Sequence, residues 1–286
     1  MNTLAKTKEI MRKNSIFAKK SFGQNFLIDD GVLQNIVDSA NVQEGDIVIE
    51  IGPGLGNLTH YILEKKAKVY AFEIDNDMID ILQERFGNDS KLVIKNEDIL
   101  KANLDEIFEK GKVKIIANLP YYITTPIIFK LLEYRKSIQS ITIMIQKEVA
   151  ERITATPNGK EYGVLTINTN VICDTQILFN VPNTSFIPAP KVISTVINII
   201  PNEEKEKSFN IKSEEIFKEL VKKAFSARRK KVANSLSNTG LYDLTKTEIE
   251  KIITDVTGNV NSRAEEISIK QYAKIANIIY EKISRD

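Results

Sequence analysis

The chain has 286 residues, enough for one large domain and a small appended one. It is 42% hydrophobic and 27% charged, and no stretch approaches the roughly eighteen uncharged apolar residues of a membrane span, which argues against a membrane role. Cys173 is the only cysteine and His60 the only histidine. This excludes an intramolecular disulfide, a Cys/His zinc site and a nucleophile–histidine pair built without His60, and it fits a reducing cytoplasm.

The charge is unevenly distributed, although its net value is only +2. Residues 1–20 hold Lys and Arg against a single acid, Glu9, and we predict that they form a basic, flexible tail. They lack the continuous apolar core of a secretory signal, whereas a transit peptide stays an open alternative. A second basic segment, residues 222–231, has no acid; its basic residues are Lys222, Lys223, Arg228, Arg229, Lys230 and Lys231.

The predicted elements begin with a helix that Asp29 and Asp30 can cap. His60 lies in what we predict to be the first turns of another helix, so we interpret it as structural. Short apolar runs at residues 46–51, 68–73, 91–94, 113–117 and 138–145 alternate with helix-like stretches. This alternation predicts a parallel sheet with crossover helices.

The rest of the chain predicts a change of architecture. Residues 163–181 fit a helix or a strand, because apolar spacing favours the first and β-branched content the second. Residues 191–200 predict a strand, and residues 201–205 a solvated linker. Helical periodicity follows at residues 213–225, 228–237, 245–256 and 268–284. We therefore expect one domain at residues 21–202 and a small helical domain at residues 203–286.

A glycine-rich loop follows the first predicted strand. Residues 50–56 read EIGPGLG, and glycines between a strand and a helix let the backbone approach a nucleotide-like ligand. The neighbouring charges are acidic: Glu50 precedes the loop, Glu73 ends the next strand and Asp98 follows the third. No Lys or Arg lies between Asp46 and Leu63. A pyrophosphate would favour cations, so the pattern favours S-adenosylmethionine, whose methionine part carries an ammonium and a sulfonium.

The turn Asn118-Leu119-Pro120-Tyr121 ends the predicted strand at residues 113–117. The Asn118 side-chain carbonyl and the Leu119 backbone carbonyl could accept the two N–H bonds of an exocyclic adenine amine and localise its lone pair. Pro120 holds the turn, and Tyr121 offers a flat face to a flipped base. The turn alone fits DNA, RNA and protein substrates equally.

Together these residues resemble the ribosomal RNA adenine dimethyltransferases, and within them the bacterial small-subunit branch. The resemblance covers nearly the whole chain, and its carriers are residues 22–27, 50–56, 71–75, 97–100, 118–122, 146–150 and 186–192. It implies a Rossmann-like class I S-adenosylmethionine-dependent methyltransferase domain, with a mostly parallel seven-stranded sheet and a C-terminal all-helical domain. The implied activity is dimethylation of two adjacent adenosines near the 3′ end of small-subunit (16S) rRNA, with a role in small-subunit maturation.

The resemblance also implies roles for individual residues. Asn25 and Leu27 would close over the cofactor, Gly52 would touch its methionine part, Glu73 its ribose and Asp98 its adenine. Asn118 would bridge cofactor and target, and Tyr121 and Phe186 would sandwich the target adenine. Two alternatives stay open: Tyr122 is either a core aromatic or part of the site, and Phe186 either plugs the domain junction or contacts the base.

RNA contact is expected from the basic patches, and residues 225–236 resemble the basic segment of the same family. The expected partner is rRNA within an immature small subunit, bound by a cytoplasmic monomer without a metal or a membrane. The alternatives are a large-subunit (23S) rRNA methyltransferase that confers macrolide resistance, a DNA adenine or protein glutamine methyltransferase, and an assembly factor that acts mainly by binding. Leu119 in place of a second Pro, together with the absence of a large DNA-recognition domain, disfavours the DNA and protein enzymes.

Overall fold

The computed structural model describes residues 2–16 and 23–284 of the chain. The chain forms two compact units, Met1–Ala150 with Gln176–Pro201 and Glu151–Thr175 with Asn202–Asp286. The second unit therefore includes residues 151–175, which the sequence pattern assigns to the first domain. The reason is that α8 (Val164–Asn170) packs against α10 (Glu214–Ala224), and the Tyr162 hydroxyl donates to the Ile267 carbonyl at 3.0 Å.

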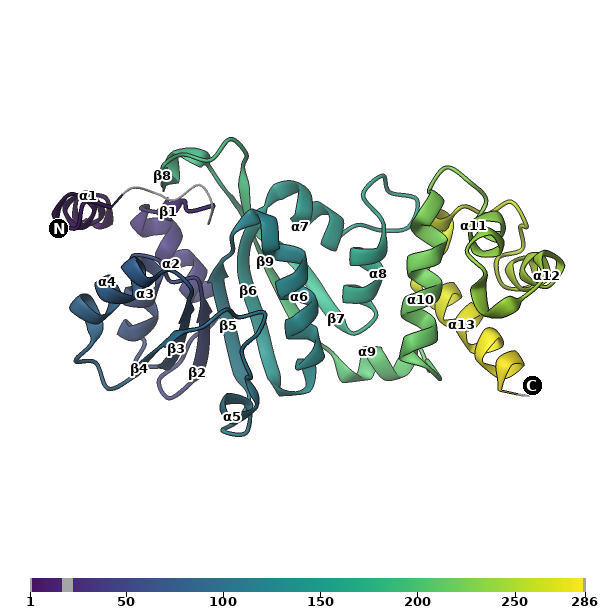
Figure 1. The fold of residues 1–286 in the computed structure, drawn as a ribbon, viewed down its shortest axis with the longest axis horizontal. Helices are drawn as coiled ribbons and strands as arrows, with labels where there is room; N and C mark the ends of the chain where they lie inside the picture. Colours follow the sequence, from purple (N-terminus) through teal and green to yellow (C-terminus); the bar gives the residue numbers. More distant parts are fainter. Residues whose placement is uncertain (1, 17–22, 285–286) are drawn as a thin grey trace. The chain divides into compact units, whose positions relative to one another are not determined.

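A seven-stranded sheet contains most of the first unit's strands, in the order β4-β3-β2-β5-β6-β9-β7 (Figure 1). The pairs β4–β3, β3–β2, β2–β5 and β5–β6 are parallel, and β9 runs antiparallel to β6. The strands are β2 (Ile47–Ile51), β3 (Lys68–Glu73), β4 (Leu92–Asn96), β5 (Val113–Asn118), β6 (Ile138–Gln146), β7 (Cys173–Val181) and β9 (Ser194–Pro201). The mostly parallel sheet with crossover helices is confirmed.

The crossover helices bury their apolar faces on this sheet. Leu33 and Ile36 of α2 and Ile62 of α3 share a core cluster with strand residues such as Val48 of β2. Asp29 caps α2 as predicted, since its carboxylate accepts the Val32 amide at 3.1 Å. The helices of this part are α2 (Asp30–Ser39), α3 (Asn57–Glu64), α4 (Asn76–Phe86), α5 (Asp105–Phe108), α6 (Thr124–Glu133) and α7 (Lys147–Ile153), the last of which crosses into the second unit.

The ambiguous residues 163–181 contain both a helix and a strand: α8 ends at Asn170 and β7 begins at Cys173. The prediction of a linker at residues 201–205 is wrong. Residues Glu203–Ser208 form α9, because the Asn202 side chain accepts the Lys205 amide at 3.0 Å and caps the helix. A cap needs only one residue with the right backbone angles, and a charged composition does not reveal it.

The flexible tail predicted at residues 1–20 is corrected for its described part. Residues Thr3–Lys13 form α1, capped by Asn2. Thr7 is fully buried and receives a hydrogen bond from the Asn57 side chain at 2.9 Å, whereas the basic side chains Lys6, Lys8 and Arg12 are exposed. The tail is thus an amphipathic helix anchored by one face. Lys19 and Lys20 lie outside the described residues.

The second unit is helical, as predicted. α10 packs against α11 (Val232–Asn238) and α13 (Ile269–Ile283), and α12 (Lys246–Thr257) packs against α11 and α13. Figure 1 shows these helices in green to yellow. Thr245 and Ser268 open α12 and α13 with capping boxes, which fixes where each helix begins.

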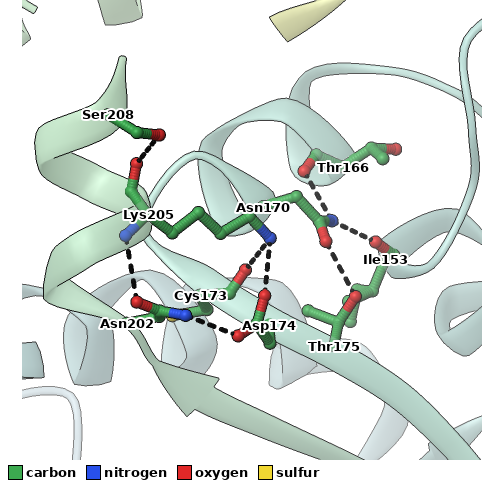
Figure 2. Close-up of polar contacts among 9 residues, drawn as sticks. All are labelled: Ile153, Thr166, Asn170, Cys173, Asp174, Thr175, Asn202, Lys205 and Ser208. Atoms are coloured by element: carbon green, nitrogen blue, oxygen red, sulfur yellow. Dashed lines mark hydrogen bonds and ion pairs between the residues drawn. The ribbon is translucent and has the colours of Figure 1, made fainter. Parts of the chain in front are cut away.

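Polar contacts connect the separate chain segments of the second unit (Figure 2). Asn170 donates to the Ile153 carbonyl at 2.6 Å and accepts from the Thr175 hydroxyl at 2.8 Å. The Asp174 carboxylate accepts from Asn202 at 2.7 Å and from Lys205 at 2.9 Å. These bonds, led by the one from Asn202, lower the pKa of Asp174. Residues 151–175 are in this way joined to the segment that starts at Asn202.

Candidate functional site

A cavity of about 1080 Å³, counting its open part, lies at the carboxyl end of the parallel strands. β2, β3, β4 and β5 end near Ile51, Glu73, Asn96 and Asn118, and the residues at or just after these ends line the cavity, except Asn96. Open parallel sheets bind ligands at this edge. Among the described residues that line the cavity, the charged ones are all acidic: Glu50, Glu73, Glu97 and Asp98.

The glycine loop forms one wall of the cavity. Gly52, Gly54 and Gly56 all have positive φ, at 67°, 55° and 76°. A Cβ on Gly56 would come within 2.6 Å of the Phe86 ring and 2.8 Å of Leu82, so a side chain there cannot fit beside α4. A Cβ on Gly52 would meet nothing closer than 4.0 Å, at the Asn118 carbonyl. Gly56 is therefore required by packing, whereas Gly52 keeps the wall next to Asn118 open.

Glu50 is buried at the base of this wall, with 1% of its surface exposed. Burial raises its pKa to about 8; Glu73 adds to the rise, whereas Thr59 and the Arg85 guanidinium oppose it. Its Oε2 atom accepts no hydrogen bond from the described residues. A buried acceptor without a donor is costly in a folded protein, so Glu50 is suited to a ligand that brings a donor or a positive charge.

Glu73 is held by the backbone. Its Oε1 atom accepts the Ile74 and Asp75 amides at 2.8 and 2.9 Å, and its Oε2 atom accepts the Gly54 amide at 3.1 Å. Burial raises its pKa, while the same three hydrogen bonds oppose that rise. Each carboxylate oxygen accepts about two hydrogen bonds, so Oε2 can take one more donor, such as a hydroxyl. Glu73 thus fixes the glycine loop and remains available to a ligand.

The turn after β5 forms the wall beside the glycine loop, because β5 pairs with β2 and Gly52 lies next to Asn118. Asn118 donates to the Asn25 carbonyl at 3.2 Å, and its side-chain oxygen accepts no bond from the described residues. The Leu119 amide donates to the Met144 carbonyl at 3.1 Å, which fixes the peptide plane. The Tyr121 hydroxyl lies 2.8 Å from Ser194 Oγ, and burial raises its pKa against the effect of that contact. The turn is therefore a set of fixed polar groups beside a half-buried ring.

The structure brings most of the predicted site residues to this cavity. Its lining includes Asn25, Leu27, Gly52, Glu73, Asp98, Asn118, Leu119 and Tyr121. Phe186 is not among the described lining residues. It is 3% exposed, pairs with Leu27 between the short strands β1 (Phe26–Leu27) and β8 (Phe186–Ile187), and lies in the main core cluster. Sequence order could not reveal this pairing, because 159 positions separate Leu27 from Phe186.

The sequence pattern does not predict several residues that contribute to this region. Asn57, which lines the cavity, donates to the Leu27 carbonyl at 2.8 Å and to Thr7 of α1. Arg85 of α4 donates to the Leu55 carbonyl and lies near enough to Glu50 to interact with it. Burial lowers the pKa of Arg85 to about 10, against the pull of Glu50. A single Arg on an amphipathic helix gives no signal of this role.

The basic segment of the second unit divides into two kinds of residue. Arg228 donates to the Lys160 and Tyr162 carbonyls at 2.7 and 2.9 Å, and Lys223 pairs with Glu219 at 2.8 Å. The other four basic residues are exposed and make no ion pair with the described residues: Lys222, Arg229, Lys230 and Lys231. Their charges are thus available to an external anion.

The described residues contain no group of three or more His, Cys, Asp or Glu side chains that could hold a metal ion. Within the same residues, no helix is both long enough and apolar enough to cross a membrane. His60 is partly exposed on α3, 3.5 Å from Glu64, and does not line the cavity.

The doubly wound sheet and the acidic, glycine-walled cavity define an S-adenosylmethionine-dependent methyltransferase of class I. The model of the ribosomal RNA adenine dimethylase family matches residues 16–281. The chain belongs to this family. The chain is 45% identical over 282 residues to ribosomal RNA small subunit methyltransferase A of Alkaliphilus oremlandii, covering 97% of both chains.

Two solved structures are similar along most of the chain. A dimethyladenosine transferase from Plasmodium falciparum has a TM-score of 0.74 and 27% identity, covering 89% of this chain and 97% of its own. The 23S rRNA methyltransferase ErmE has a TM-score of 0.67 and 23% identity, covering 90% of this chain and 100% of its own, which shows a common fold. The fold thus does not by itself choose between small-subunit and large-subunit RNA.

Proposed function

We propose that this chain transfers two methyl groups from S-adenosylmethionine to each of two adjacent adenosines near the 3′ end of small-subunit (16S) rRNA, and thereby takes part in small-subunit maturation. The observation that carries the proposal is that the acidic residues and the Asn118–Tyr121 turn line one and the same cavity. The 45% identity to a small-subunit methyltransferase over 97% of both chains supports the choice of substrate. We place the activity in the cytoplasm, in a monomer that binds an immature subunit.

The cofactor fits the residues that are present. Glu50 offers a buried, unpaired oxygen to an ammonium, and the described lining holds no cation that would repel a sulfonium. Gly52 would lie against the methionine part, Glu73 would accept the ribose hydroxyls and Asp98 the adenine amine, while Asn25 and Leu27 close the cavity. When bound, the sulfonium supplies an electrophilic methyl group.

The turn would hold the target. The side-chain oxygen of Asn118 and the carbonyl of Leu119, which accepts none of the described turn and loop hydrogen bonds, would accept the two N–H groups of the adenine amine. Tyr121 would stack against the base, its ring held by Ser194. In this proposal Phe186 does not contact the base. It acts indirectly, because it holds Leu27 in place through the β1–β8 pairing. For Phe186 to stack on the base itself, it would have to leave the core.

No strong base is required for this reaction. An in-line displacement at a sulfonium depends on alignment, and well-oriented reactants gain several kcal/mol, up to about 10, from positioning. The amine becomes acidic on alkylation and loses its proton to water. A second transfer then needs only room for the monomethylated amine to turn.

The test is label transfer from S-adenosylmethionine to undermethylated small and large ribosomal subunits. We expect label on small-subunit RNA only. The Asn118→Ala variant should lose at least about 100-fold in transfer rate while retaining subunit binding. Asn96→Ala is the matched control, because Asn96 also ends a strand but does not line the cavity. Label confined to large-subunit RNA, or a normal rate in Asn118→Ala, would reject the proposal.

The rival reading as a binding-only assembly factor makes a different prediction. A Glu73→Ala variant, which removes the carboxylate that accepts the Gly54 amide, should then still support small-subunit maturation in cells that lack the wild-type protein. We expect instead that maturation fails together with methylation.

A further inference from the structure

Two successive tyrosines of the site point to different environments. Tyr121 is half-buried and its hydroxyl is engaged with Ser194. Tyr122 is 57% exposed, although it also lines the cavity. Its hydroxyl makes no hydrogen bond with the described residues. Tyr122 is therefore neither a core aromatic nor a polar anchor of the fold.

The Tyr122 ring lies beside Gly23 at the edge of the cavity. A Cβ added to Gly23 would be 3.5 and 3.7 Å from ring carbons Cδ1 and Cε1, so the glycine leaves room for a methyl group next to the ring. Pro120 Cβ is 4.0 Å from the same point. The ring thus borders the segment that leads into Asn25, and more than half of its surface remains open to solvent.

Exposed apolar side chains occur in the chain segments that form this site. Seven large hydrophobic residues are exposed among the described residues, and two of them, Ile74 and Tyr122, line the cavity. Val192 and Ile193 are two more, and they directly precede Ser194, the partner of Tyr121. A large apolar group left in water at a functional opening indicates a surface that a ligand covers.

We propose that Tyr122 is a stacking platform for the base next to the target adenine. This inference rests on the proposed function. Two adjacent adenosines are to be modified, so while one base occupies the cavity the neighbouring base is one nucleotide away and has lost its stacking partner. An aromatic ring that is open to solvent at the cavity replaces that partner without reading the sequence. Tyr122 is in this account a positioning residue for the RNA and takes no part in methyl transfer.

The first test compares Tyr122→Ala with Tyr122→Phe. Stacking on an aromatic side chain is worth about 1–3 kcal/mol per base, so Tyr122→Ala should raise the KM for undermethylated small subunits by about 5- to 160-fold. Tyr122→Phe should restore it to within about twofold. Tyr280→Ala, an exposed tyrosine on α13, is the matched control and should leave KM unchanged.

The affinity for S-adenosylmethionine separates stacking from a structural role. If Tyr122 only supported the Gly23 segment, its loss would weaken cofactor binding, whereas the stacking role leaves the cofactor Kd unchanged. A weakened cofactor Kd with an unchanged RNA KM in Tyr122→Ala would overturn the inference.

A second test uses the absence of tryptophan from the chain. Tyr122→Trp places a single indole at the platform, and a single-stranded RNA with two adjacent adenosines should quench its fluorescence saturably. The same RNA should not affect Tyr280→Trp. Unaltered emission from Tyr122→Trp, or quenching by ribosomal protein but not by RNA, would overturn the inference. Wild-type protein that fails to methylate small subunits would instead reject the proposed function, so the two failures are distinguishable.

Discussion

The cofactor cavity and the basic segment both collect charges of one sign, but they do so in opposite ways. The acids of the cavity come from separate stretches at Glu50, Glu73 and residues 97–98, and the sheet brings them together. The cations of the basic segment are neighbours in the sequence, between residues 222 and 231. Yet two of the six, Lys223 and Arg228, are engaged within the fold.

The comparison teaches that contacts, and not proximity in sequence, decide what a charged side chain is free to do. Glu73 accepts three backbone amides and still has capacity for a ligand, because a carboxylate has about four acceptor sites. Arg228 already donates to two carbonyls, so it acts chiefly as a structural residue. The predictions below test this division, starting with the largest effect.

Glu73→Gln should weaken S-adenosylmethionine binding by about 100-fold and lower the free energy of unfolding by about 1–3 kcal/mol. The amide keeps the shape but places an NH2 group against backbone N–H groups that need an acceptor. Calorimetric titration and chemical denaturation measure the two effects. Glu97→Gln, an exposed acid of the same lining, is the control and should change both only slightly. Equal effects in the two variants would remove the special role of Glu73.

Glu50 makes the stability of the cofactor-free protein depend on pH. Its native pKa, raised by burial to about 8, exceeds the ordinary value of 4.5, so the unfolded state releases this proton first. The raised pKa therefore destabilises the cofactor-free protein progressively as pH rises from about 4.5 to about 8. Glu50→Gln lacks this cost, and its stability relative to wild type should increase across that interval. Denaturation at pH 5, 7 and 9 measures it, and a difference that is constant with pH would contradict the account.

Arg228 and Arg229 test the division within the basic segment. Arg229→Ala should reduce the salt dependence of RNA binding by about 0.7–0.9 in the slope of log K against log salt, without changing stability. Arg228→Ala should lower the free energy of unfolding by about 1 kcal/mol, because the Lys160 and Tyr162 carbonyls lose a donor, and should change the slope less. A loss of stability in Arg229→Ala together with the larger change of slope in Arg228→Ala would show that the two carbonyl contacts of Arg228 do not determine its role.

Thr7→Val should have the smallest effect. Thr7 is buried, and its hydroxyl accepts one of the two hydrogen bonds of the Asn57 amide. Removing that acceptor while keeping the shape should lower the free energy of unfolding by about 1 kcal/mol and leave the cofactor Kd within about twofold. A larger loss of cofactor affinity would mean that α1 belongs to the cofactor site.

The sequence predicts much of this molecule because its strongest signals are local. The strands β2 to β6 follow from apolar runs, and the cavity follows from parallel strands whose carboxyl ends share one edge. Caps such as Asn202 before α9, and the separation of α8 from β7 within residues 163–181, depend on one or two backbone angles. The pattern of apolar residues in the sequence does not reveal these backbone angles.

The remaining site residues depend on tertiary contacts between distant segments. Phe186 reaches Leu27 through a two-residue strand pairing, and Thr7 reaches Asn57 through the docking of α1. Tyr121 and Tyr122 are identical in chemistry and adjacent in sequence, but the Tyr121 hydroxyl contacts Ser194, whereas Tyr122 is 57% exposed. Which ring is buried is decided by residues that are far away in the chain.

The most direct test of the central claim is the mass of each nucleotide near the 3′ end of small-subunit rRNA after reaction with the wild-type protein and S-adenosylmethionine. The account predicts two adjacent adenosines that each carry two added methyl groups on the exocyclic nitrogen, and no change when Asn118→Ala replaces the wild type. Methylation at a single adenosine, on another base, or only in large-subunit RNA would contradict it.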